Sequence, residues 1–137
     1  MGASFHMSLP CLSVKTTKSF YADTIGASLG RITQNWVDVN LFGNQLTFIK
    51  AEKFSFNSPN YVFEGKILPS FHFGIIVDLK DWEQIYARLN DQKLDVVTQA
   101  RFLEGKTGEH VSFFIKDPND YMLEFKSFEN PNSIFEK

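Results

Sequence analysis

A short alternating segment that opens with Phe-His occurs twice in this chain, near the start of each half. In residues 70–78 the apolar side chains share one face of an extended strand, and His72 lies on the opposite face. Residues 5–12 repeat the pattern, with His6 opposite the apolar side. The repetition predicts two similar halves, each beginning with a strand that points a histidine away from its apolar layer.

The rest of each half has the same order of elements, namely a helix followed by three strands. In the first half we expect a helix capped by Thr16 or Thr17 and ended by Gly26, and then strands near residues 29–33, 36–42 and 45–50. In the second half we expect a helix over 81–91 and strands over 95–102, 110–116 and 121–128.

These expectations define the fold class as α+β. We predict one domain over residues 5–128, in which paired β-α-β-β-β modules (about 5–50 and 70–128) form a curled mixed sheet around a shared cavity. Residues 51–69 are interpreted as a long connection between the modules, and residues 129–137 as a C-terminal tail.

Composition excludes several classes of function. With 137 residues, 43% of them hydrophobic, the chain is expected to form a folded globular domain. A formal net charge of −2 without a basic run argues against nucleic-acid binding. The chain has no apolar run of the ~20 residues that cross a bilayer. We expect no secretory signal, because the first residues contain no basic segment followed by an apolar stretch. The single cysteine, Cys11, falls on an apolar face; it excludes an internal disulfide and fits a cytoplasmic protein.

Three residues on the strand faces away from the apolar layers form a potential metal site: His6, His72 and Glu124. Two imidazoles and a carboxylate suit Fe(II), Mn(II) or Zn(II). Three protein ligands leave coordination positions open for water or substrate, as metal catalysis requires. From the residues alone, the alternative of separate surface or core side chains stays open.

Four segments, taken in order, resemble the vicinal oxygen chelate superfamily. They are Phe-His-Met-Ser-Leu-Pro, Ser-Phe-Tyr-Ala-Asp-Thr-Ile-Gly, His-Phe-Gly-Ile-Ile-Val and Asp-Pro-Asn-Asp-Tyr-Met-Leu-Glu-Phe. The superfamily includes glyoxalase I, extradiol dioxygenases, fosfomycin-resistance thiol transferases and bleomycin-binding proteins. The resemblance covers roughly residues 5–128 and implies metal ligands at His6, His72 and Glu124. It favours one Fe(II) or Mn(II) per site, with Zn(II) or Ni(II) as alternatives.

Two departures from the resemblance bear on the activity. Glyoxalase I has a further carboxylate ligand on the fourth strand, where this chain has Gln45 and Thr47, so we expect no glyoxalase activity. Extradiol dioxygenases carry Ser-Phe-Tyr on the seventh strand, where this chain has Ser112, Phe113 and Phe114. The expected function is a dioxygenase-like, metal-dependent enzyme acting on a small chelating molecule. A non-catalytic antibiotic-binding protein and a thiol transferase or lyase are the alternatives.

Further candidates for the site each have a structural alternative. Glu124 and His110 are the catalytic candidates; His110 is either a general acid–base near the metal or a solvent-exposed residue at a strand end. The substrate-binding candidates are Trp36, Asp38, Thr47, Arg101 and Phe114. As alternatives to substrate binding, Asp38 and Arg101 form a structural pair, and Trp36 and Phe114 simply fill the cavity. Because each half is too small to cover its own open sheet, and the resembling family pairs modules between chains, we expect a homodimer.

Overall fold

The structure is a computed structural model that describes residues 2–137, and it consists of two compact units. The first unit comprises Met1–Phe56 together with Asp117–Asp120. The second comprises Asn57–Lys116 together with Tyr121–Lys137. Within the described part of the chain, no helix is both long and apolar enough to cross a membrane.

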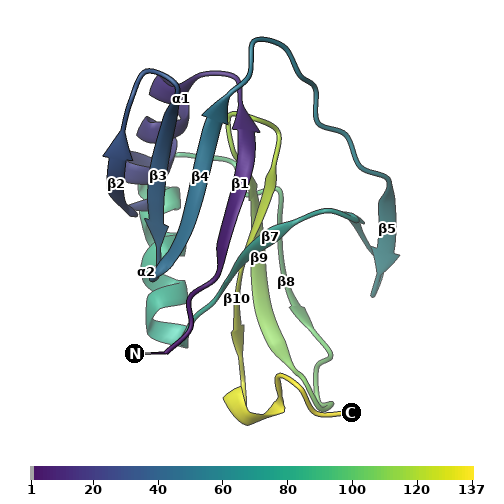
Figure 1. Cartoon of the computed structure of the whole chain (residues 1–137). Coiled ribbons are helices and arrows are strands. Elements are labelled where there is room, and N and C mark those ends of the chain that lie inside the picture. The colour runs from purple at the N-terminus through teal and green to yellow at the C-terminus, as the bar shows by residue number, and fades with distance from the viewer. Residues whose placement is uncertain (1) are drawn as a thin grey trace. The chain divides into compact units, whose positions relative to one another are not determined.

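The first unit contains a four-stranded mixed sheet with the order β1-β4-β3-β2 (Figure 1). Strand β1 runs parallel to β4, and the other neighbours are antiparallel. The helix α1 packs on β3 and β4. The elements are β1 (His6–Cys11), α1 (Val14–Ser19), the π-helical turn η1 (Phe20–Ile25), β2 (Ser28–Ile32), β3 (Trp36–Leu41) and β4 (Asn44–Lys50).

The first helix begins earlier than predicted. Its N-cap is Ser13, whose hydroxyl accepts a hydrogen bond from the Thr16 N–H at 3.2 Å, so the prediction of a threonine cap is wrong. Thr17 instead faces inward and is fully buried. The predicted end of the helix is confirmed, because Gly26 adopts the left-handed conformation with φ of 90°.

The second unit contains a sheet of the same order, β7-β10-β9-β8, in which β7 runs parallel to β10 (Figure 1). The predicted α+β fold and the paired β-α-β-β-β modules are therefore confirmed. The helix α2 buries an apolar stripe formed by Trp82, Ile85 and Leu89. The elements are β5 (Asn60–Phe63), β6 (Lys66–Pro69), β7 (Phe73–Ile76), α2 (Leu79–Asp91), β8 (Thr98–Phe102), β9 (His110–Lys116), β10 (Met122–Phe128) and the 3₁₀ turn η2 (Pro131–Ser133).

The stretch between the modules is not a structureless connection. Residues 60–69 form a β-hairpin, β5-β6, which pairs Phe63 with Lys66 across a two-residue turn. The turn residues Glu64 and Gly65 have φ of 48° and 76°, and two successive positive φ values match the twist of a hairpin. The sequence-based interpretation missed this hairpin.

The predicted apolar strand faces form the core. Val37, Val39 and Phe48 in the first unit, and Phe113 and Phe125 in the second, are all fully buried. In β9 and β10 the opposite face is buried as well, including Phe114 and Glu124, which are only 1% and 8% exposed. Cys11 is buried as expected, and burial raises the pKa of its thiol.

Candidate functional site

The face of the second sheet away from α2 carries an imidazole and a carboxylate side by side. The Nε2 atom of His72 lies 3.5 Å from Oε1 of Glu124. The other ring nitrogen, Nδ1, lies 3.0 Å from the carbonyl oxygen of Pro69. Because a carbonyl oxygen only accepts, this contact assigns the proton to Nδ1. In the neutral imidazole, Nε2 then presents its lone pair beside the carboxylate. A backbone carbonyl on the far ring nitrogen is typical of metal-ligating histidines.

A glycine brings the two strands that carry this pair close together. Gly74 lies two residues after His72 and directly opposite Glu124 in the parallel register of β7 and β10. A Cβ at position 74 would collide with the backbone carbonyl of Glu124. The absence of a side chain therefore allows the backbone approach that sets His72 beside the carboxylate.

Aromatic rings hold the imidazole from two sides. Tyr61 of the hairpin stacks on His72, with ring centroids 6.4 Å apart and planes 14° from parallel. Phe114 meets the same ring edge-on, at 5.4 Å and 82°. Phe114 also lies opposite Glu124 in the β9–β10 register, so this one residue of β9 adjoins both members of the pair.

Charges and hydroxyl groups complete the second-unit site. The Lys126 ammonium lies 3.9 Å from Oε1 of Glu124. Burial, and then the charge of Glu124, raise the pKa of the Tyr61 phenol. The Ser112 hydroxyl is buried and makes no hydrogen bond within the part of the chain that the structure describes. Ser112 lies on the same strand face as Phe114 and opposite Lys126, so an unsatisfied polar atom also faces this side of the sheet.

The predicted site residues of the first unit form a different arrangement. The Thr47 hydroxyl donates to Oδ1 of Asp38 at 2.7 Å, and Arg31 lies 3.1 Å from Oδ2. The hydrogen bond from Thr47, followed by the contact with Arg31, lowers the pKa of Asp38. His6 is exposed on β1 opposite Gln45, and Trp36 is half-buried on β3. Asp38 therefore already has its charge partner within the unit.

The registers of the two sheets make Thr47 the equivalent of Glu124. Ser8, two residues after His6, lies opposite Thr47, just as Gly74 lies opposite Glu124. In the antiparallel pairing of β3 with β4, Asp38 lies directly opposite Thr47. Strand β4 thus has no carboxylate at the position equivalent to Glu124, and the neighbouring strand β3 carries one, Asp38, instead.

The structure does not bring His110 beside the pair in the second unit. It lies opposite Phe128, four residues along β10 from Glu124, or about 13 Å at the rise of a strand. The ring is buried between Phe102 and Phe128, with centroids at 5.5 and 4.9 Å, and Nδ1 lies 2.7 Å from the Gly108 carbonyl. The alternative of an exposed strand-end histidine is therefore wrong, because His110 is only 9% exposed.

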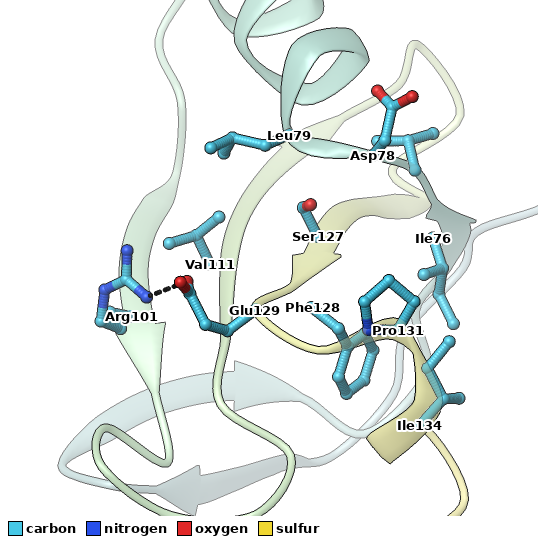
Figure 2. Close-up of a pocket in the computed structure, with 11 residues that line it drawn as sticks. Ile76, Asp78, Leu79, Arg101, Val111, Ser127, Phe128, Glu129, Pro131 and Ile134 are labelled. Atoms are coloured by element: carbon cyan, nitrogen blue, oxygen red, sulfur yellow. Dashed lines mark hydrogen bonds and ion pairs between the residues drawn. The ribbon is translucent and has the colours of Figure 1, made fainter.

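Arg101 lies on the opposite face of the sheet. Its neighbours in β8, Ala100 and Phe102, pack on the Glu124 side, so strand alternation turns Arg101 away. Its guanidinium lies 2.8 Å from Glu109 and 3.4 Å from Glu129, and the hydrogen bond to Glu109 raises its pKa. Figure 2 shows it at the edge of a separate hollow of about 470 Å³. Besides Arg101, that hollow is lined by Ile76, Leu79, Val111, Phe128, Pro131 and Ile134, among others.

Within residues 2–137, no group of three or more His, Cys, Asp or Glu side chains is arranged to hold a metal ion. His72 and Glu124 are two of the three predicted ligands, and the participation of His6 stays a prediction. Sequence reasoning missed Tyr61 and Lys126 as neighbours of the pair. Lys126 shares the strand face of Glu124 by simple alternation, and the alternation around Glu64-Gly65 was the available signal for the hairpin that carries Tyr61.

Comparison with known proteins identifies the fold. No protein-family profile matches the chain, and no curated protein sequence matches it. A glyoxalase/bleomycin resistance protein/dioxygenase from Alicyclobacillus acidocaldarius has a similar structure, with a TM-score of 0.81 and 24% identity over 97% of this chain and 96% of that one. A lactoylglutathione lyase from Agrobacterium tumefaciens has a TM-score of 0.66 and 17% identity over 93% of this chain and 94% of that one. A fosfomycin resistance protein from Listeria monocytogenes has a TM-score of 0.68 and 10% identity over 98% of this chain and 99% of that one. The chain therefore has the fold of the glyoxalase and dioxygenase structures, as the sequence resemblance implied.

Proposed function

We propose that the protein is a divalent-metal-dependent enzyme that acts on a small molecule able to chelate the metal through two neighbouring oxygens, with dioxygenase-like chemistry. The observation that carries the proposal is the contact between Nε2 of His72 and the Glu124 carboxylate at 3.5 Å, with Nδ1 directed at a backbone carbonyl. A neutral imidazole nitrogen and a carboxylate oxygen are donors that first-row divalent metals bind. We propose His6 as the third ligand.

The donor set fits Fe(II) or Mn(II) best, with Zn(II) or Ni(II) as alternatives, because two imidazoles and one carboxylate leave several positions open. When bound, such a metal supplies Lewis acidity and, in the case of iron, reactivity toward dioxygen. The chain's own residues orient the site: the Pro69 carbonyl fixes the imidazole tautomer, and Tyr61 and Phe114 hold its ring.

Thr47 argues against lactoylglutathione lyase chemistry and sets this proposal apart from it. At the position equivalent to Glu124 in the first sheet, a hydroxyl donates to Asp38 rather than presenting a carboxylate. A neutral hydroxyl is a weak metal ligand beside a carboxylate, so a fourth protein ligand is not provided there.

A non-catalytic ligand-binding protein is the second candidate. It is favoured by the lack of a three-residue metal cluster among residues 2–137. In that case His72 and Glu124 form a largely buried pair that contributes to binding a small molecule, and no metal is required.

Metal analysis separates the two candidates. The protein is purified without chelators or metal-affinity resin, reloaded separately with Mn(II) and Fe(II), and its metal content is measured by mass spectrometry. We expect about one metal per chain, and a sharp loss in Glu124→Gln because one of few ligands is removed. Glu109→Gln is the matched control, since Glu109 lies in the ion pair with Arg101 and should keep full occupancy. Equal occupancy in both variants would reject the assigned site.

A further inference from the structure

The hairpin β5-β6 is fixed against the sheet face that carries Glu124. Its inner side joins an apolar cluster, and its tip is held by Glu64, whose carboxylate accepts hydrogen bonds from the Leu103 N–H at 3.0 and 3.1 Å. The cluster contains Leu68, Phe102, Phe114 and Met122, with Phe63 and Ala100 packed against it. The side chains on this inner side therefore have defined positions relative to the sheet.

Tyr61 is one of the inner-side residues. It lies opposite the buried Leu68 in the hairpin register and two residues before Phe63, so strand alternation places all three on one side. Its ring stacks on His72 at 6.4 Å. Tyr61 is 40% exposed, and within residues 2–137 its hydroxyl makes no hydrogen bond. The Tyr61 ring is therefore held in place by its packing, and its O–H remains available to donate a hydrogen bond.

The other residues around His72 and Glu124 leave few groups to meet an oxygen of a ligand. Phe114, directly opposite Glu124, has no donor. Lys126 contributes a positive charge 3.9 Å from the carboxylate, with 30% of its side chain exposed. A hydroxyl donor and an ammonium on the same side are complementary to an anionic oxygen.

We propose that Tyr61 is a ligand-binding residue, whose phenol O–H donates a hydrogen bond to an oxygen of a molecule held beside His72 and Glu124. The ligand class is a small molecule with two neighbouring oxygens, one of them anionic, such as a catecholate or an enediolate. This inference rests on the proposed function, because it concerns the same site. It adds a specificity residue from the hairpin, outside both four-stranded sheets.

The test uses Tyr61→Phe, which keeps the ring stacked on His72 and removes only the donor. The probe is 4-nitrocatechol, whose absorbance changes with ionisation and hydrogen bonding, titrated into Mn(II)-loaded protein. We expect the Kd for Tyr61→Phe to rise about fivefold or more, as for a lost hydrogen bond to an anionic oxygen. The absorption maximum of the bound probe should shift as well. Metal content and the melting temperature should match the wild type.

Tyr86→Phe is the matched control. Tyr86 is a half-buried tyrosine of the same unit that stacks on Trp82 at 5.4 Å, so its hydroxyl should have no effect on the probe. Equal Kd values and spectra for wild type and Tyr61→Phe would overturn the role of Tyr61 while leaving the proposed function in place. A weaker affinity accompanied by a lower melting temperature would also overturn it, because the effect would then come from loosening the hairpin. A Mn(II)-loaded wild-type protein that does not bind 4-nitrocatechol would reject both proposals.

Discussion

The approach of β7 to β10 makes Gly74→Ala a sharp test of the site geometry. A Cβ at position 74 would collide with the carbonyl oxygen of Glu124 and would lie 2.8 Å from its backbone nitrogen. Both atoms belong to the backbone of a central strand, so the edge strand β7 must yield. To restore ordinary contacts, β7 has to move by about 1 Å or more, and His72 moves with it.

The magnitude follows from the packing of the strand. Overpacking of this kind costs about 1–3 kcal/mol of unfolding free energy, which corresponds to a melting temperature lower by roughly 4–12 °C for a chain of this size. The 3.5 Å contact between His72 and Glu124 would change by a similar displacement, whereas functional sites tolerate only about 0.5 Å. Metal affinity should therefore fall even in the folded fraction of the variant.

Thermal unfolding and metal titration of Gly74→Ala measure the two effects separately. Gly30→Ala is the matched control in a strand of the first sheet, because a Cβ there would lie 3.2 Å from Cβ of Asp38, a contact that a small adjustment relieves. If Gly74→Ala had the same melting temperature and the same metal affinity as the wild type, the deduced close approach of β7 to Glu124 would be refuted.

Three further outcomes are expected. Light scattering at micromolar concentration should give the mass of a homodimer, and a monomer would count against module pairing between chains. With methylglyoxal and glutathione the protein should show no useful lyase activity with any metal, and rapid hemithioacetal turnover would contradict the role given to Thr47. Ligands with two neighbouring oxygens should instead perturb the spectrum of the Co(II)-loaded form. Thr47→Val should lower stability by about 1 kcal/mol at neutral pH. Because the folded-state pKa of Asp38 is depressed, this difference is present above pH ~4 and should disappear as the pH falls through the folded pKa, which urea unfolding at several pH values would reveal.

The fold class, the repeat and the sheet faces all follow from local patterns in the sequence. Strand alternation depends only on the two-residue period of an extended chain, so the order of residues alone predicts that Val37, Val39, Phe113 and Phe125 are buried. The same reasoning placed His6, His72 and Glu124 on the strand faces away from the apolar layers. These properties are local, or follow from similarity between the two halves.

Which side chains contact one another depends on long-range packing and on strand register. Residues 60–69 fold back over the sheet because Leu68 and Phe63 bury against residues far away in sequence, and this packing sets Tyr61 beside His72. Long-range packing likewise buries His110 between two aromatic rings instead of exposing it. The face occupied by Arg101 depended on the register of β8 against β9, which its own segment does not encode. Contacts between distant segments arise from packing and strand register, and a periodicity in sequence carries information on neither.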